Sequence, residues 1–319
     1  AGQNFKTALK PGCCVKIMTG APVPAGADAV VMVESSEERD GLVKFTETIA
    51  KGDNIAMRGE DIKKGQKILA RGTVLDISHI AVLAAVGRGR VNTGALPSAA
   101  LVNTGGEIVP PGAKLAGNRI YNSNGPMLAA MLKTDGIAAA PVIVRDEEKK
   151  LKAALAKALK SDIVLISGGV SMGDYDLVPA VLKSLGVRTV FHKVRVRPGK
   201  PMLFGVKGRK LVFGIPGNPV SNFMAYLAYV RPAIRKLSGR ADCAPAFRTG
   251  LCATKFDPRT PRRALVLSKV KTACGYSLAE VSNNGSADIL ALAGAGGFTM
   301  VKEGGSLKKG EKAEFLTWL

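Results

Sequence analysis

Several features are scarce in this sequence of 319 residues, and each absence narrows what the protein can be. No apolar run approaches the about 18–20 residues that a membrane-spanning helix needs, so we expect no membrane partner. The first residues, AGQNFKTALKPG, show no signal-peptide pattern, which favours a cytoplasmic protein. Aromatic residues amount to only 5%, too few for the stacking platforms of single-strand nucleic-acid binders.

Histidine and cysteine are too sparse for a zinc centre. The sequence has two histidines, His79 and His192, and five cysteines without a single Cys-x-x-Cys pair. A zinc site needs such side chains clustered at ligand spacing. The number of cysteines is odd and two are adjacent, so we interpret them as reduced thiols. A phosphate-binding P-loop is excluded as well, because no Gly-x-x-x-x-Gly-Lys-Ser/Thr pattern occurs.

Positive charge, in contrast, is abundant. The chain carries 46 Lys and Arg against 25 Asp and Glu, a net charge of +21. Such an excess favours an anionic partner: a phosphate, an oxyanion or a nucleic acid. The basic residues are spread along the chain with no block of five or more like charges. We therefore expect no specific nucleic-acid partner, and nonspecific nucleic-acid binding remains an alternative that charge alone suggests.

The pattern of apolar residues predicts an α/β multidomain protein. Short β-like runs, Val30–Glu34 among them, fill a β-rich domain at 1–66, and a helical linker segment at 67–97 follows it. Strands alternate with helices over 98–240, which predicts a mostly parallel sheet covered on both faces. Residues 241–319 return to strand patterns and predict a small C-terminal β-barrel domain with one short helix.

Four strand ends of the α/β domain carry unusual chemistry: NTGGE (103–107), RDEE (145–148), SGGVSMGDYD (167–176) and GIPGNP (214–219). Ligands of open parallel sheets bind beyond the carboxyl ends of the strands. In the third stretch, Gly168, Gly169 and Ser171 are substrate-binding candidates, because bare backbone can approach a ligand and present amides to an anion. Asp174 and Asp176 follow, and either of them has the alternative role of capping the next helix.

Acids and bases are predicted to face each other at this edge. Glu107, Asp146 and Asp176 end three strands, and hard oxygen ligands beside phosphates suit Mg²⁺. In HKVRVRPGKP, a strand would place Lys193, Arg195 and Arg197 on one face, where they would bind phosphate or an oxyanion. Lys200 follows a Pro-Gly turn. The alternative is a strand face that only contacts solvent.

Two turns complete the candidate site. Pro216 and Pro219 stiffen GIPGNP and Asn218 offers an amide, so this turn either contacts a ligand or is structural. Thr19, in MTGAPVP, lies in the β-rich domain, where it either reaches a ligand or forms an ordinary turn.

In this order, IMTGAPVPAGADAVVMVE, RGEDIKKGQ, NTGGEI, SGGVSMGDYD, RPGKPMLFG and GIPGNPVSNF resemble the molybdopterin molybdenumtransferase (MoeA) family, to which the E domain of gephyrin is also related. The likeness covers nearly the whole chain. It implies a MogA-like molybdopterin-binding α/β sandwich and a Mg²⁺-dependent reaction in which adenylyl-molybdopterin and molybdate give the molybdenum cofactor and AMP. It also implies a homodimer and a molybdopterin adenylyltransferase as partner.

The resemblance assigns roles residue by residue. It implies catalytic roles for Thr19, Glu107, Asp146, Asp176, Lys193 and Arg197, with the three acids as metal ligands. It implies substrate contacts for Pro216, Pro219, Arg262 and Ser286.

The sequence also departs from the family. It does not contain the family's N-terminal Asn-Ser-Ala-Met-Asp-Gly-Tyr-Ala segment with its functional aspartate, and Gly106 stands where an acid or amide is usual. Arg197 stands where lysine is also common. A molybdopterin-binding or scaffold module without turnover is therefore the alternative function.

Overall fold

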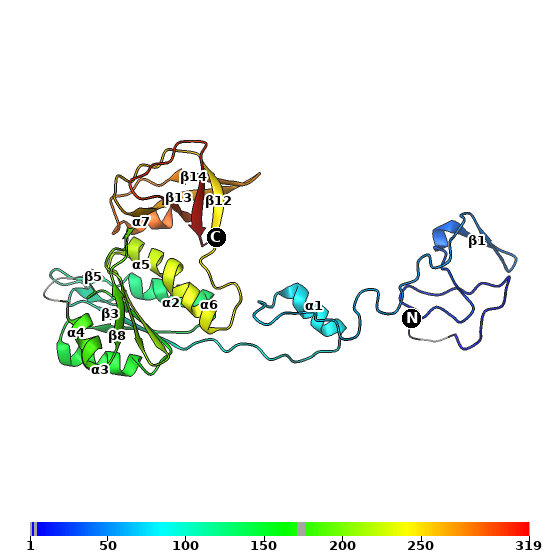
Figure 1. Ribbon diagram of the computed structural model, residues 1–319, viewed down its shortest axis with the longest axis horizontal. Coiled ribbons are helices and arrows are strands. Elements are labelled where there is room, and N and C mark those ends of the chain that lie inside the picture. The colour runs from blue at the N-terminus through cyan, green and yellow to red at the C-terminus, as the bar shows by residue number, and fades with distance from the viewer. Residues whose placement is uncertain (1, 3–4, 171–175, 319) are drawn as a thin grey trace. The chain divides into compact units, whose positions relative to one another are not determined.

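The structure is a computed structural model that describes residues 2, 5–170 and 176–318. The chain divides into two compact units, Ala1–Ala70 and Arg71–Leu319, and each is described by itself (Figure 1). The predictions for Ser171 and Asp174 lie outside the described residues. No helix in the described ranges is long and apolar enough to cross a membrane.

The first unit has little regular structure. Its strands β1 (Ser36–Arg39) and β2 (Leu42–Phe45) form a hairpin. Asp40 and Gly41 make the two-residue turn with φ of 53° and 78°, the left-handed conformation that tight hairpins require. The strand predicted at Val30–Glu34 was wrong, because a 3₁₀ turn (Val33–Ser35) interrupts it. Val30 is instead held by single hydrogen bonds to Asp53 and Asn54.

The second unit begins with helix α1 (Ile77–Ala85). Asp76 is its N-cap: the carboxylate accepts the His79 amide, and the His79 ring pairs with the Asp76 amide. Gly87, with φ of 73°, follows the helix in the left-handed conformation that commonly ends one.

A six-stranded sheet forms the centre of this unit, in the order β6-β3-β7-β11-β10-β8. Neighbours among the first four strands are parallel, and β10 runs antiparallel to both β11 and β8. The carboxyl ends of β6, β3, β7 and β11 therefore meet at one edge, as the sequence predicted. The bounds are β3 (Ala99–Thr104), β6 (Pro141–Val144), β7 (Ile163–Ser167), β8 (Arg188–His192), β10 (Leu203–Lys207) and β11 (Lys210–Ile215).

Helices cover both faces of the sheet because β7 is apolar on both sides. Ile163 and Leu165 pack with helices α2 (Asn124–Thr134), α5 (Pro219–Ala225) and α6 (Arg231–Leu237). Val164 and Ile166 pack with α3 (Glu148–Ala158) and α4 (Leu177–Ser184). The helical segment after GIPGNP is interrupted between α5 and α6 by a π-helical turn, Tyr226–Val230.

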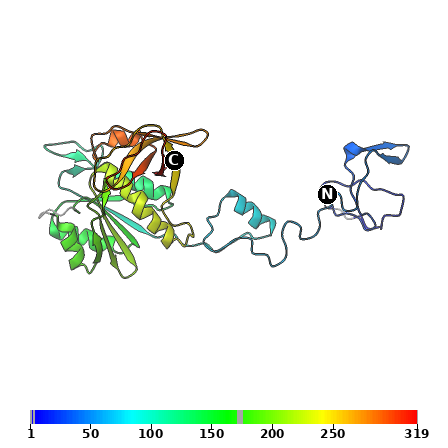
Figure 2. The same ribbon diagram turned by 45° about the horizontal axis from the view of Figure 1, so that its top comes forward.

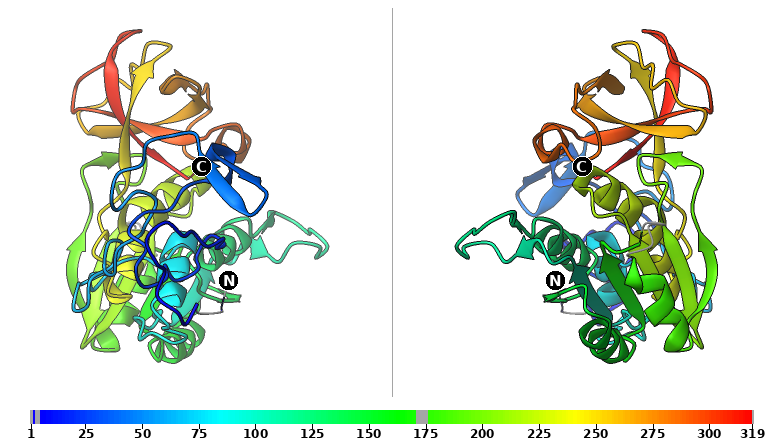
Figure 3. Two further views of the ribbon diagram at one scale, coloured as in Figure 1. Left: turned by 90° about the vertical axis from the view of Figure 1, so that its right-hand side faces the viewer. Right: turned by 90° about the vertical axis from the view of Figure 1, so that its left-hand side faces the viewer.

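The C-terminal strands close into a barrel in the order β14-β12-β16-β15-β13, with β14 also pairing with β13. The barrel stacks on the α5 side of the sheet, where Leu265 and Phe298 join the core of α2 and α5 (Figures 2 and 3). The remaining bounds are β4 (Ile108–Val109), β5 (Ile120–Tyr121), β9 (Val196–Arg197), β12 (Phe247–Cys252), β13 (Arg263–Thr272), β14 (Tyr276–Glu280), α7 (Ile289–Ala293), β15 (Gly297–Val301) and β16 (Lys312–Thr317).

Candidate functional site

A polar network joins the ends of strands β7 and β11 to helices α2 and α5 at the carboxyl edge of the sheet. The Ser167 hydroxyl, at the end of β7, accepts the side-chain amides of Asn124 at 3.2 Å and Asn222 at 2.8 Å. The same amide groups donate to the carbonyls of Gly217 at 2.6 Å and Pro216 at 3.0 Å. The network therefore fixes the backbone of the predicted Pro-Gly-Asn-Pro turn. Sequence reasoning missed these three residues, and the only local signal was that Ser167 ends β7 and Asn124 begins α2.

Unpaired oxygens gather along this edge. In the described part of the chain, five buried side-chain oxygens lack a hydrogen-bond partner, all of them on loops or elements that meet there. Buried polar atoms in proteins nearly always have partners, so atoms of this kind indicate positions for ordered water or a ligand. The five atoms are Asn103 Oδ1, Thr104 Oγ1, Asn124 Oδ1, Asp176 Oδ2 and Asn222 Oδ1.

Gly168 and Gly169 are glycines for a packing reason. Their φ angles are 92° and 61°. A Cβ on Gly168 would lie 2.5 Å from the Thr104 carbonyl oxygen, and one on Gly169 would lie 2.7 Å from the Thr104 hydroxyl. The loop after β7 thus presses its bare backbone onto the end of β3. This contact does not test the predicted role of these glycines in substrate binding.

The predicted metal ligands Glu107 and Asp146 lie on adjacent loops. Asp146 Oδ2 accepts the Gly106 amide at 3.1 Å, and a Cβ on Gly105 would lie 2.7 Å from both carboxylate oxygens of Glu107. Both acids are exposed. Two carboxylates held by neighbouring residues of one loop are oxygen donors of the kind that Mg²⁺ uses.

Asp176 is positioned differently from the other two acids. It occupies the N-cap position of α4 with extended backbone, yet its side chain makes no capping hydrogen bond. Helix capping therefore does not explain this carboxylate, one oxygen of which is buried and unpaired. Within the described ranges, no three His, Cys, Asp or Glu side chains are close enough together to hold a metal ion. The three-acid metal site stays a prediction.

The cationic stretch is a crossover from the sheet to the barrel and is not one continuous strand. β8 ends at His192, whose ring contacts the Val170 carbonyl at 2.9 Å and so ties the crossover to the glycine loop. Further along, β9 pairs with β13. Exposure still alternates: Lys193, Arg195 and Arg197 are exposed, whereas Val194 and Val196 are half-buried.

The cations differ in their contacts. Arg197 Nη1 donates to the Pro258 carbonyl at 3.2 Å, and Arg195 pairs with Glu303, also at 3.2 Å. Lys193 and Lys200 are exposed and have no hydrogen bond or ion pair from their ammonium groups to the described residues. The two lysines are consequently the cations most available to an anion.

The barrel contributes two predicted residues to the same region. Asn218 donates its side-chain amide to the Ser286 hydroxyl at 2.8 Å, and the Val220 amide donates to the Ser286 carbonyl at 3.1 Å. Arg262 donates to the Val196 carbonyl at 3.1 Å. Ser286 therefore adjoins the turn that holds Pro216 and Pro219, and Arg262 adjoins the crossover.

Thr19 belongs to the other unit. It is exposed in a turn that the hydrogen bond from the Ala21 amide to the Met18 carbonyl closes at 2.9 Å. Its predicted catalytic role remains a prediction.

Family comparisons define the class of the protein first. Residues 100–236 match the family model of a probable molybdopterin binding domain, and residues 1–87 match that of the MoeA N-terminal region, domains I and II. The first match spans the sheet and the loops that carry the candidate site. The class is therefore that of α/β proteins with a molybdopterin-binding type of domain.

Whole-chain similarities then identify the family. The chain is 32% identical over 307 residues to a molybdopterin molybdenumtransferase of Staphylococcus epidermidis, covering 95% of this chain and 73% of that one. For the Staphylococcus aureus enzyme the values are 32%, 91% and 70%. The crystal structure of a molybdopterin biosynthesis MoeA protein from Pyrococcus horikoshii matches with a TM-score of 0.82 at 31% identity, covering 100% of this chain and 79% of that one. This chain belongs to the molybdopterin molybdenumtransferase (MoeA) family.

Proposed function

We propose that this protein is a molybdopterin molybdenumtransferase: it inserts molybdenum from molybdate into adenylylated molybdopterin and releases AMP. Its family membership supports a role in molybdenum cofactor biosynthesis. The observation that carries the proposal is the row of five unpaired buried oxygens at the carboxyl edge, flanked by carboxylates on one side and the cationic crossover on the other. A ligand that has both hydrogen-bond donors and phosphates fits such an edge.

The cations have the role of binding the anionic substrates. Lys193, Lys200 and Arg197 would hold molybdate and the phosphates, because charge-assisted hydrogen bonds favour such groups. The same residues would stabilise the negative charge that develops on the AMP phosphate as the phosphoanhydride bond breaks. Gly168 and Gly169, which have no side chains, would let the main chain of their loop contact the substrate. On the other side of the substrate site would lie Pro216, Asn218, Pro219, Arg262 and Ser286.

Glu107, Asp146 and Asp176 are the proposed ligands of a divalent ion, Mg²⁺ in the leading interpretation. Magnesium in phosphate sites commonly uses one or two carboxylates and completes its shell with water and substrate oxygens, so Glu107 and Asp146 suit it. When bound, the ion would neutralise charge on the phosphates of the substrate.

The decisive assay incubates the purified protein with adenylyl-molybdopterin, Mg²⁺ and molybdate and measures AMP. We expect AMP release, and we expect Asp176→Asn to abolish it while adenylyl-molybdopterin still binds. Lys193→Ala and Arg197→Ala should weaken the response to molybdate. Arg209→Ala, which removes a cation from the exposed β10–β11 turn, is the matched control. Normal turnover by Asp176→Asn would refute the metal assignment.

The assay also separates the alternatives. Binding of adenylyl-molybdopterin without AMP release would establish a molybdopterin-binding or scaffold module. DNA binding that disappears by about 200 mM salt would be a nonspecific effect of the charge.

The assembly proposal is a homodimer located in the cytoplasm that receives its substrate from a molybdopterin adenylyltransferase. Support for the dimer comes from α1, in which every residue except Ser78 and His79 is apolar and none is buried. We propose domain limits of 1–66, 67–97, 98–240 and 241–319.

A further inference from the structure

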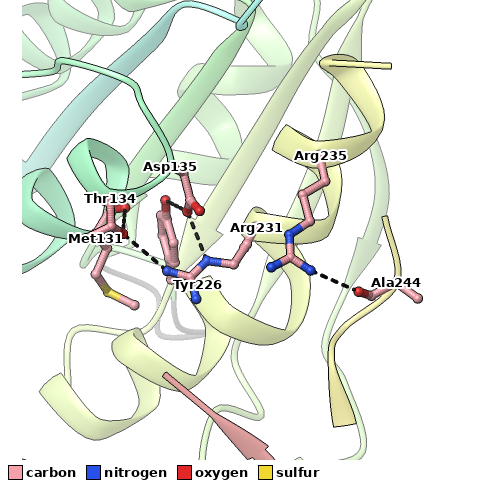
Figure 4. A network of polar contacts seen from close by, with 7 residues as sticks. All are labelled: Met131, Thr134, Asp135, Tyr226, Arg231, Arg235 and Ala244. Atoms are coloured by element: carbon pink, nitrogen blue, oxygen red, sulfur yellow. Dashed lines mark hydrogen bonds and ion pairs between the residues drawn. The ribbon is translucent and has the colours of Figure 1, made fainter. Parts of the chain in front are cut away.

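A second cationic cluster lies away from the crossover, on α6. Arg231 donates from Nε to Asp135 Oδ2 at 3.0 Å, and the Tyr226 hydroxyl donates to the same oxygen at 2.6 Å (Figure 4). Burial and the hydrogen bond to Asp135 raise the pKa of Tyr226, so this hydroxyl keeps its proton. Oδ2 of Asp135 is thus shared by Arg231 and Tyr226.

Arg235 lies one helical turn further along and lacks such a partner. Its one hydrogen bond in the described part of the chain runs from Nη1 to the Ala244 carbonyl at 3.4 Å (Figure 4). Its Nε is buried and has no acceptor among the described residues. Burial, with the nearby charges of Arg240 and Arg231, lowers the pKa of Arg235. A guanidinium has five donors, and leaving a buried one unpaired is unfavourable.

The local charges do not balance. Asp242 is held by both nitrogens of the Arg240 fork, at 2.9 Å and 2.6 Å, and Asp135 is held by Arg231. Two carboxylates therefore lie among three arginines. Both carboxylates are paired with Arg231 and Arg240, so the positive charge of Arg235 is not neutralised by either of them. The carboxylates named here are also the acids that influence the pKa of Arg235.

Arg231 and Arg235 line the same small pocket between α6 and the end of β16. Besides the two arginines, it is lined by Leu227, Pro232, Pro245, Ala246, Leu316 and Thr317, so the lining has no acidic side chain. No carboxylate of the pocket therefore competes with an incoming anion for the two guanidinium groups. The pocket thus combines a surplus positive charge, on an arginine with an unpaired donor, and a lining without carboxylates.

We propose that this pocket binds a small oxyanion, a group with two or more equivalent charged oxygens. Its oxygens accept from the guanidinium groups of Arg235 and Arg231, because a planar fork matches carboxylate and phosphate geometry. The anion neutralises Arg235 and links α6 to β16. This site is separate from the proposed transferase site and does not depend on it.

Calorimetric titration of the full chain at low ionic strength tests the proposal, with phosphate and sulfate as tetrahedral probes and acetate as the carboxylate probe. We expect saturable binding of at least one probe and an at least about tenfold loss of affinity in Arg235→Gln. Arg235→Lys should lose less, because it keeps the charge without the fork. Arg209→Gln, which removes a charge from an exposed turn, should bind as the parent does. The preferred probe distinguishes a phosphate-type ligand from a carboxylate.

Amide chemical shifts locate the bound anion even if Arg235→Gln fails to fold. In the parent chain, the probe should shift the amides of α6, Ala246 and Leu316. Shifts confined to the crossover, loss of binding in Lys193→Ala with retention in Arg235→Gln, or no saturable binding of any probe would each overturn the proposal.

Discussion

At the scale of single residues, Asp76 predicts how α1 responds to acid. Hydrogen bonds from Ser78 and the His79 amide lower the pKa of Asp76 from 3.8 to about 2. Because the folded pKa lies below the unfolded one, the cap stabilises α1 at and above pH 4 and loses this effect as the pH falls towards 2. The protection factor of the His79 amide against hydrogen exchange should therefore fall over this window.

Asp76→Asn is the control for this prediction, since it keeps a capping oxygen without a titrating charge. Its α1 amides should show no such transition below pH 4. An equal acid response in Asp76→Asn and the parent would show that another group controls the helix.

Gly168 gives a prediction about close packing. Gly168→Ala places a methyl group 2.5 Å from the Thr104 carbonyl at a positive φ, so we expect loss of about 1–3 kcal/mol from overpacking in addition to backbone strain. Gly208→Ala is a matched control: its φ is also positive, at 57°, but no atom lies within 4 Å. Urea unfolding of both variants measures the difference. Equal destabilisation would mean that the contact with Thr104 contributes nothing.

At the scale of elements, Ser167 connects β7, α2 and α5. Ser167→Ala leaves the buried amide of Asn222 and the half-buried amide of Asn124 without their shared acceptor, so we expect the free energy of unfolding to fall by about 1–3 kcal/mol. Ser184→Ala removes only a local bond to the Val181 carbonyl and should change little. Unfolding curves give the energies, and amide shifts of Gly217 and Asn218 report whether the turn has moved. If the Gly217 and Asn218 amide shifts are unchanged in this variant, Ser167 does not position the turn.

The elements that the sequence predicted correctly are those whose pattern is strong and local. Ile163–Ile166 is apolar on both faces, as a strand in the centre of a covered sheet requires, and Leu151 and Leu155, four residues apart, form the buried face of α3. Val30–Glu34 is equally apolar but has no strand to pair with, so it does not form a ladder. The cationic stretch kept the alternating exposure of a strand but was divided between sheet and barrel by tertiary pairing.

At the scale of the whole molecule, the order of strands along the sequence predicts at which edge of the sheet the site lies, but it does not predict the contacts within the site. Because parallel strands end together, the sequence predicts that Glu107, Asp146 and the loop of Gly168 lie at one edge. The contact of Asn218 with Ser286 spans 68 residues, and Asn222 with Ser167 spans 55. Nothing local in a sequence encodes such pairs, because they depend on how the barrel and α5 pack.

Helix α1 supplies the last prediction, which concerns the proposed homodimer. Its Ile77 and Ile80 are 89% and 61% exposed, an unfavourable arrangement for an apolar helix unless another surface covers it. We expect light scattering to give a molar mass twice that of one chain. We expect the Ile80→Glu variant to have the mass of the monomer. Glutamate favours helix, so α1 itself should persist.

Val142→Glu is the control for that experiment, since it replaces another exposed apolar residue, Val142 on strand β6, with the same charged residue. The Val142 side chain is 53% exposed. This variant should remain dimeric, which would assign the effect to α1 and not to added charge. A monomeric parent would refute the dimer, and a dimer unaffected by both Ile77→Glu and Ile80→Glu would move its interface away from α1. Because burial of two large aliphatic side chains contributes about 1.5–3 kcal/mol each, loss of either should be measurable in the dissociation constant.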